Sequence, residues 1–255
     1  MGTECAIVVA SRRQAFEGEA WIHDLASRFT RFSSDSELSR LNARAGGWID
    51  ISAELEAVLR AAMRAFEMSG GLVNAAVLPS MLASGYIRPL AGGPGRAVLE
   101  RAQPTPALVD VMQLRQGRAR LERGAGIDVG GIAKGWMADR LCEILAAECV
   151  VNLGGDLRVV GRWPVGFRGT TLMLRDQAAA TSSVRKRKWA GGHHLIDPRT
   201  GAPCATGLEE VSVVTPTAFE AEVVAKTALL LGPELATAYC ASHALAWWVG
   251  GPDDA

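Results

Sequence analysis

The chain has 255 residues, 49% of them hydrophobic, with 27 basic and 27 acidic side chains. This length and apolar fraction suit one large domain or two small ones, and they exclude intrinsic disorder, which needs low hydrophobicity and an excess of charge. The formal net charge of zero also argues against a duplex nucleic-acid binder, because such proteins carry a basic surplus that neutralises phosphates.

Signals for membranes, export and disulfides are missing from the sequence. No stretch has the ~18 uninterrupted apolar residues that a membrane span requires. The N-terminal run MGTECAIVVASRR has no basic lead and no small-residue cleavage site, so we expect no signal peptide. Five cysteines without a CxxC pair argue against a disulfide framework or structural zinc. We predict a cytoplasmic protein that neither inserts into a membrane nor binds nucleic acid.

The first half of the chain predicts mixed secondary structure. We expect a strand at 5–10, a helix at 13–30, a loop at 32–42 and a strand at 48–52. Ser52 is a good N-cap for the next helix. That helix has apolar residues at helical spacing from Leu55 to Phe66 and ends at Gly70-Gly71, where a left-handed cap is favoured. Residues 83–106, rich in Pro and Gly, predict a long connection.

The second half continues the mixture. We expect a hairpin that turns at Gln116-Gly117, helices at 132–147 and 217–231, and strands in CVVNL, LRVVG, TLMLRD, EVSVVTP and ALAWWVG. On the helix at 132–147 the apolar side is expected to contain Ile132, Trp136, Met137, Leu141, Ile144 and Leu145. Strands and helices do not alternate strictly, so the fold class is α/β or a mixed α+β sheet, in one domain over residues 1–255.

A glycine-rich turn, Asp128-Val-Gly-Gly-Ile-Ala-Lys134-Gly, opens the helix at 132–147. Free backbone N–H groups at such a turn favour an anion such as a phosphate, and the alternative is a tight turn with a solvated lysine. The spacing fits neither a Walker A loop nor a dinucleotide-binding fingerprint. In Asn152-Leu-Gly-Gly-Asp156 the aspartate could accept from ligand hydroxyls, or the segment could be an ordinary turn.

Two further patterns contain chemically active side chains. In His193-His194-Leu-Ile-Asp197 a histidine can act as a base and the aspartate can orient it, unless Asp197 caps the turn that follows. In the helix at 217–231, Glu222 and Lys226 lie between apolar neighbours. One interpretation is an exposed i,i+4 ion pair, which stabilises a helix by about 0.3–0.5 kcal/mol. Because apolar residues flank both side chains, we expect them instead to point into a site.

Taken in order, these segments resemble the ApbE-type FAD:protein FMN transferases. The resemblance extends from the N-terminus through 29–42, 70–79, 128–139, 152–156, 180–182 and 193–201 to the helix at 221–228. It implies a single domain with FAD in a cleft. It also implies transfer of FMN from FAD to a Ser or Thr hydroxyl of an acceptor flavoprotein, with release of AMP and help from Mg²⁺.

The resemblance also implies roles for individual residues. The positions that would contact FAD are Met1, Phe32, Leu72, Val73, Asn74, Asp128, Lys134 and Ile196. His194 aligns with the proposed base, while the Gly131 carbonyl and Glu222 align with metal ligands. Phe32 replaces the family's usual tyrosine.

Three departures lie at positions where the resemblance implies a carboxylate or a metal ligand. Asn74 replaces an expected carboxylate, and Glu222 replaces a metal-binding Asp. Lys226 replaces the metal-binding Thr and cannot ligate Mg²⁺ while protonated. Either Lys226 takes over part of the cation's role, held in place by Glu222, or the protein binds FAD without turnover. A further alternative is an FAD pyrophosphatase that yields FMN and AMP.

Overall fold

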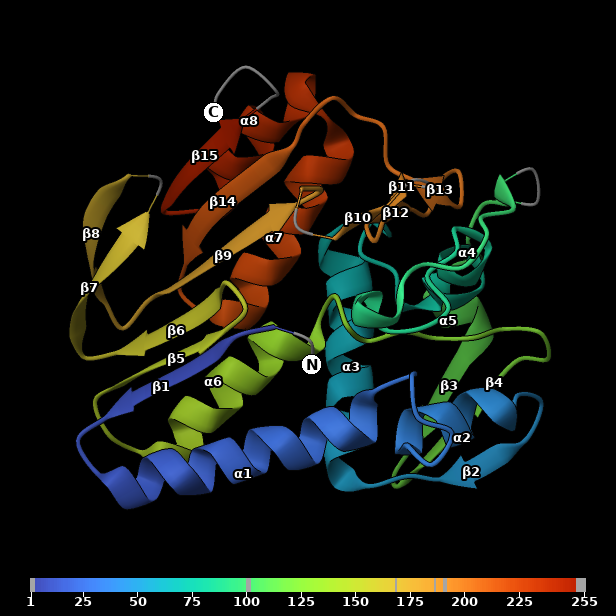
Figure 1. The fold of residues 1–255 in the computed structure, drawn as a ribbon, viewed down its shortest axis with the longest axis horizontal. Coiled ribbons are helices and arrows are strands. Elements are labelled where there is room, and N and C mark those ends of the chain that lie inside the picture. Colours follow the sequence, from blue (N-terminus) through green and yellow to red (C-terminus); the bar gives the residue numbers. More distant parts are fainter. Residues whose placement is uncertain (1–2, 100–101, 168, 186, 190–191, 251–255) are drawn as a thin grey trace. The chain divides into compact units, whose positions relative to one another are not determined.

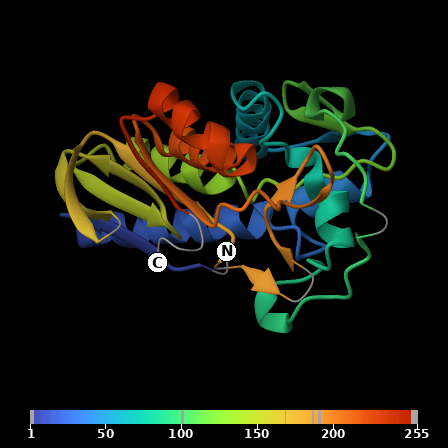
Figure 2. The same cartoon turned by 90° about the horizontal axis from the view of Figure 1, so that it is seen from above.

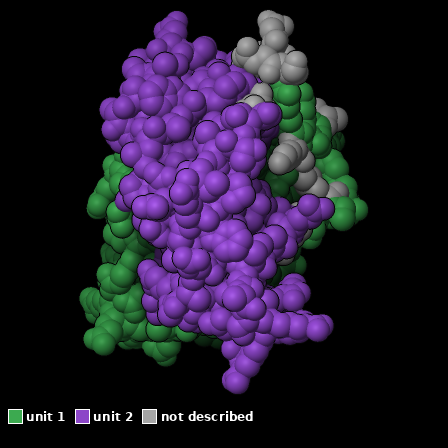
Figure 3. All heavy atoms as spheres, turned by 90° about the vertical axis from the view of Figure 1, so that its left-hand side faces the viewer, with its two compact units in different colours: residues 1–2, 25–131, 184–205 green, residues 3–24, 132–183, 206–255 purple. Residues whose placement is uncertain are grey.

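The computed structural model describes residues 3–99, 102–167, 169–185, 187–189 and 192–250. The chain divides into two compact units, coloured separately in Figure 3. Unit 1 contains residues 1–2, 25–131 and 184–205, and unit 2 contains 3–24, 132–183 and 206–255. Helix α1 (Arg12–Phe29) passes from unit 2 into unit 1. Each unit is thus assembled from separate stretches of sequence.

Unit 2 is built on an antiparallel sheet. Among the described residues this sheet has the strand order β1-β5-β6-β9-β14-β15 (Figure 1). Its strands are β1 (Cys5–Val9), β5 (Cys149–Leu153), β6 (Asp156–Val160), β9 (Ala178–Ser183), β14 (Glu210–Thr215) and β15 (Ala246–Gly250). A separate hairpin consists of β7 (Arg162–Phe167) and β8 (Thr170–Arg175).

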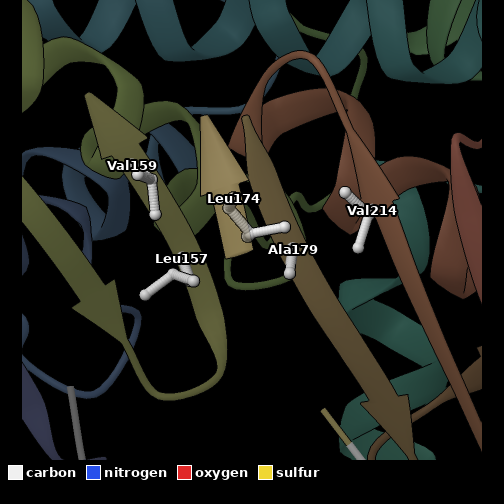
Figure 4. Packing of buried hydrophobic residues seen from close by; sticks show 5 residues of the cluster. All are labelled: Leu157, Val159, Leu174, Ala179 and Val214. Atoms are coloured by element: carbon white, nitrogen blue, oxygen red, sulfur yellow. The ribbon is translucent and has the colours of Figure 1, made fainter. Parts of the chain in front are cut away.

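The two faces of this sheet have different neighbours. Helices α6 (Ala133–Leu145), α7 (Ala218–Leu231) and α8 (Pro233–His243) pack on it, as Figure 2 shows from above. Because side chains alternate along a strand, β6 turns Asp156 and Arg158 to the helices and Leu157 and Val159 to the other face. There a core cluster forms with the β7–β8 hairpin, composed of Leu157, Val159, Leu174, Ala179 and Val214 (Figure 4).

Unit 1 has shorter elements around one long helix, α3 (Ala53–Met68). The others are α2 (Glu37–Ala43), β2 (Trp48–Asp50), η1 (Ala75–Val77), α4 (Leu78–Ala83), η2 (Leu90–Gly92), α5 (Leu108–Val111), β3 (Met112–Arg115), β4 (Arg118–Leu121), β10 (Lys188–Trp189), β11 (Gly192–His193), β12 (Ile196–Asp197) and β13 (Ala202–Pro203). Strands β2, β4 and β3 form a sheet in that order. As predicted, the Ser52 hydroxyl caps α3, accepting from Leu55 N at 3.1 Å.

Several local expectations were wrong. Residues 37–43 form helix α2 instead of a loop, because the Ser36 hydroxyl accepts from Ser39 N and caps its first turn. Ile144 on α6 is 50% exposed, although its spacing predicted a buried position. Strands β7 and β9 and helix α8 have no counterpart among the predicted elements. The mixed helix-and-sheet class is confirmed.

No helix within the described ranges combines the length and the apolarity needed to cross a bilayer.

Candidate functional site

Asp128 lies in unit 1, and both oxygens of its carboxylate accept a hydrogen bond. Arg31 Nε donates to Oδ2 at 2.6 Å, and Gly130 N donates to Oδ1 at 2.7 Å. The backbone N–H of Asp128 donates to the Ala75 carbonyl at 2.8 Å. The Gly130 amide was predicted to be available to an external anion. In the structure it instead donates to Asp128 of the same turn.

Helix α2 positions the residue before Asp128. The side chain of Asn42 donates to the Ile127 carbonyl at 2.9 Å and accepts from Ile127 N at 2.8 Å. The Asn42 amide thus pairs with both backbone groups of Ile127, as a neighbouring strand would, and fixes the backbone where the turn begins. The segment at 29–42 thus supports Asp128 twice, through Arg31 and through Asn42.

Aromatic rings surround the Arg31 guanidinium. Its Cζ lies 4.2 Å from the ring centre of Phe32 and 4.5 Å from that of Tyr86, distances at which cation–π attraction is favourable. The ring centres of Tyr86 and Trp189 are 5.4 Å apart, and Ile196 packs against Tyr86. We call Arg31, Phe32, Asn42, Tyr86 and Asp128 the Asp128 cluster. It unites the predicted residues Phe32 and Asp128, with Ile196 at its border.

Leu72, Val73 and Asn74 follow α3 in unit 1. The Asn74 side chain accepts from Ala76 N at 2.9 Å and donates to the Pro106 carbonyl at 2.9 Å. An aspartate could not make the second bond, because it lacks the N–H donor. The amide at this position therefore makes a bond that the expected carboxylate could not make. Val73 is buried and Leu72 is half-buried.

In the histidine segment, Asp197 caps the turn that follows it and does not orient a histidine in the described contacts. Arg199 binds the Asp197 carboxylate, with Nη2 at 2.7 Å from Oδ2, and the Asp197 carbonyl accepts from Gly201 N at 2.8 Å. His193 is buried between backbone groups of Cys204 and Leu195. The backbone N–H of His194 donates to the Arg187 carbonyl at 3.3 Å.

Unit 2 contains a buried group of four charges, which we call the lysine–carboxylate cluster: Lys134, Asp156, Glu222 and Lys226. Lys134 Nζ binds the Asp156 carboxylate and lies 2.7 Å from Glu222 Oε1. Lys226 Nζ lies 3.7 Å from the same Glu222 oxygen. Lys134 is therefore not solvated, and Glu222 and Lys226 are not an isolated surface pair. The predicted residues Lys134, Glu222 and Lys226 come together here.

Burial and charge act in opposite directions on these groups. Burial alone would lower the pKa of Lys134, but Asp156 and Glu222 outweigh it and raise that pKa above its usual value. Burial would raise the pKa of Glu222, yet the two ammonium groups lower it. Burial and the nearby Glu222 raise the pKa of Asp156 to about 6. Lys134, Asp156 and Glu222 are thus charged at neutral pH.

Helices α6 and α7 cap each other around this cluster. Glu222 Oε2 on α7 accepts from Gly135 N in the first turn of α6 at 2.9 Å. In return, Asp139 on α6 accepts from Ala218 N and Phe219 N at the start of α7, both at 2.8 Å. A carboxylate at a helix N-terminus satisfies unpaired N–H groups and the helix dipole. Glu222 is consequently a structural group as well as a charged one.

The turn between β5 and β6 delivers Asp156. Asn152 Oδ1 accepts from Gly155 N at 2.9 Å, and Gly154 and Gly155 have φ values of 71° and 103°. Both interpretations of this segment therefore apply in part: it is an ordinary turn, and its aspartate is directed to Lys134.

The remaining predicted residues are Gly131, half-buried in unit 1, and Met1, which lies outside the described residues. Sequence reasoning missed Arg31, Asn42 and Tyr86. Arg31 and Asn42 act on positions 97 and 85 residues away, and no local pattern indicates such a partner.

Comparisons with known proteins agree over almost the whole chain. The sequence profile of the ApbE family matches residues 1–248. A protein of Treponema pallidum named FAD:protein FMN transferase is 28% identical over 286 residues, covering 92% of this chain and 77% of the relative. One of the same name from Haemophilus influenzae is 25% identical over 271 residues, covering 91% and 76%.

Solved structures show the same fold. The ApbE protein of Thermotoga maritima superposes with a TM-score of 0.81 at 21% identity, over 95% of this chain and 88% of that one. The flavinyl transferase ApbE of Pseudomonas stutzeri, in its apo form, gives 0.80 at 18% identity, over 100% and 93%.

Proposed function

Because this chain belongs to the ApbE family, we propose that it is an FAD:protein FMN transferase, which moves FMN from FAD to an acceptor protein and releases AMP. The observation that carries the proposal is the family match over residues 1–248. The curated relatives named for this activity cover more than nine-tenths of the chain and support it. The finer proposal is that the acceptor is a flavoprotein whose Ser or Thr hydroxyl receives the FMN.

In the proposed reaction the acceptor hydroxyl attacks the phosphorus on the FMN side of the FAD diphosphate. A bond forms from the hydroxyl oxygen to phosphorus, the bond from phosphorus to the bridging oxygen breaks, and AMP leaves with that oxygen. His194 accepts the hydroxyl proton. Such a transfer depends mainly on positioning and on neutralising charge.

The flavin-binding roles are proposed for residues of unit 1. Phe32 is 38% exposed and presents an aromatic surface, supported by Arg31 and Tyr86, that suits a flat ring system. Asp128, Ile196, Leu72 and Val73 would contribute further contacts, and Met1 is proposed from the resemblance alone. Asn74 would act through the backbone that it holds.

Lys134 is proposed to meet the phosphates. It lies in the first turn of α6, where the helix dipole also favours negative charge. Its partners Asp156 and Glu222 hold its ammonium group in one place. This restraint reduces the entropy lost when a phosphate binds.

The residues present do not fit the Mg²⁺ ion that the family resemblance implies at Gly131 and Glu222. Both Glu222 oxygens already accept hydrogen bonds, from Lys134 Nζ and from Gly135 N. Mg²⁺ requires oxygen ligands at about 2.0–2.1 Å, and a protonated lysine supplies none. Among the described residues no three His, Cys, Asp or Glu side chains are grouped to hold a metal. The proposed transfer therefore relies on the charges of the chain itself.

The activity is tested by mixing the protein with FAD and an acceptor fragment that bears a Ser/Thr-Gly-Ala-Ser/Thr site, with Mg²⁺ and separately with EDTA. We expect a flavin-fluorescent acceptor band that survives denaturation, together with equimolar AMP. The control is the same fragment with its accepting hydroxyl residue changed to Ala.

Two outcomes would contradict the transferase. Release of FMN and AMP without an acceptor indicates a pyrophosphatase, and bound FAD without AMP under either condition indicates a carrier. A His194→Gln variant is expected to slow transfer by about 10²–10⁴-fold if His194 is the base.

We also propose a cytoplasmic location. It is supported by five cysteines without a CxxC pair, which suit a reducing compartment.

A further inference from the structure

We propose that the ammonium groups of Lys134 and Lys226, in place of a divalent metal, supply the positive charge that holds the diphosphate of FAD. This inference rests on the proposed function, because it names how the same site binds its substrate. It concerns the lysine–carboxylate cluster of unit 2.

The first argument is the occupancy of the carboxylates. Glu222 Oε1 has Lys134 Nζ at 2.7 Å and Lys226 Nζ at 3.7 Å, and Oε2 accepts from Gly135 N at 2.9 Å. Asp156 is bound by Lys134. A metal ion at Glu222 would have to displace buried charge-assisted bonds and uncap α6, both of which oppose its binding.

The second argument is which groups are exposed. The side chains of Asp156 and Glu222 are 6% and 3% exposed, whereas those of Lys134 and Lys226 are 16% and 13% exposed. The two carboxylate side chains are therefore the more deeply buried, and the lysine side chains carry most of the accessible surface of the cluster. A ligand therefore reaches the lysine side chains first, and their ammonium groups can donate hydrogen bonds to phosphate oxygens but repel a metal cation.

The third argument is the charge balance. Two ammonium groups and two carboxylates lie together in the cluster, with Lys134 Nζ and Lys226 Nζ 2.7 and 3.7 Å from the same Glu222 oxygen. A divalent cation bound at Glu222 would lie beside both ammonium groups, and their repulsion is weakly screened in a mostly buried place. A diphosphate instead adds negative charge beside two cations that share one oxygen neighbour.

The sequence position of Lys226 suits this role. It lies one helical turn after Glu222 on α7, so both side chains project from one side of the helix. The neighbouring residues Val223, Val224 and Ala225 are buried, which restricts where the lysine can go. An exposed lysine would sample many rotamers, whereas this one is confined near its carboxylate.

The experiment measures FAD binding by calorimetry in EDTA and in Mg²⁺, with transfer to the acceptor fragment measured in parallel. For the unchanged protein we expect the same FAD affinity in both solutions and no heat when Mg²⁺ alone is titrated. Lys226→Met, which keeps the length of the side chain but removes its charge, is expected to bind FAD about tenfold more weakly.

Two further variants complete the test. Lys226→Thr leaves the cluster with one net negative charge and a hydroxyl oxygen, so its FAD binding is expected to gain Mg²⁺ dependence. Arg140→Met is the matched control, because it removes an exposed cation from α6 and should leave FAD affinity unchanged. Melting temperatures of all variants verify folding.

The outcomes separate this inference from the proposed function. FAD binding by the unchanged protein only with Mg²⁺ overturns the inference even if transfer occurs. Unchanged affinity in Lys226→Met, or no gain of Mg²⁺ dependence in Lys226→Thr, also counts against it. FAD binding in EDTA without any transfer overturns the proposed function and leaves the inference standing, and no FAD binding at all overturns both.

Discussion

His193 shows how backbone partners fix one ionisation state of a single residue. Leu195 N donates to Nδ1 at 3.2 Å, so the ring proton is on Nε2, which donates to the Cys204 carbonyl at 2.9 Å. Protonation of Nδ1 would break the first bond and place a charge in a buried site. Burial accordingly lowers the pKa of His193, with the Lys188 ammonium acting in the same direction and the Cys204 bond opposing it in part.

This arrangement predicts how stability depends on pH. Because the pKa of His193 is lower in the folded state than the ordinary value of about 6.5, the unfolded chain binds the proton more tightly. The stabilisation is complete above that pH and is lost as the pH falls below it. Urea unfolding at pH 5 to 8 should show a steeper loss for the unchanged protein than for His193→Gln, and identical pH profiles would refute the assignment.

At the same scale, the sequence singled out three charged residues that the structure brings together. Lys134, Glu222 and Lys226 were singled out by their unusual positions, and the structure groups them. Asn74 was noticed as a departure, but its reason depends on the Pro106 carbonyl, 32 residues away. Contacts across such separations have no periodicity, so a single sequence contains no signal for them.

Among the elements, α6 and α7 depend on each other most directly. Gly135 allows their close approach, because a Cβ atom there would lie 2.5 Å from the Ala218 carbonyl oxygen and 3.0 Å from Phe219 Cα. These are backbone atoms, which cannot rotate away. The glycine of the predicted turn thus serves the contact between the two helices.

We expect Gly135→Ala to destabilise the protein by roughly 1–3 kcal/mol, the usual effect of overpacking, despite the better helix propensity of Ala. The measurement is the urea unfolding midpoint. Gly166→Ala is the matched control, because nothing lies within 4 Å of a Cβ atom at that position of β7. A change below about 0.5 kcal/mol for Gly135→Ala would show that the helices can separate freely.

The success of prediction differed among the elements for physical reasons. Helix α7 is apolar nearly all round, and the structure buries it as expected. Strand β9 was missed because its sequence, AAATSS, has no alternation and few β-branched residues, although it lies between β6 and β14. Helix α2 was missed because it has only seven residues, lies in a polar segment and is capped by a single serine, Ser36.

For the whole molecule, the main feature is that the units interleave along the chain. Unit 2 takes β1 from the N-terminal region and its other strands from residues beyond 131. Within that unit, Gln14 Nε2 donates to the Leu145 carbonyl at 2.9 Å, and Trp21 stacks on Trp136. The sequence predicted one domain over 1–255, which stays a prediction. It gave no sign of the interleaving, because composition does not change at the crossing points.

A fragment of residues 132–255 is therefore expected to fail to fold alone. It lacks β1 and α1, so β5, with the apolar sequence CVVNL, would become an unprotected edge strand and promote aggregation. Coexpression with residues 1–131 should restore a soluble pair. Far-ultraviolet circular dichroism with thermal melting tests this, and a sharp transition for the fragment alone would contradict it.

The same pairing has a consequence for biosynthesis. Strand β1 leaves the ribosome early, yet its partner Cys149–Leu153 follows about 140 residues later. At roughly 5–20 residues per second, this delay lasts about 7 to 30 seconds. Throughout that interval the backbone N–H and C=O groups of β1 lack the strand with which they pair in the folded unit, and an unpaired apolar strand is a natural client for ribosome-associated chaperones.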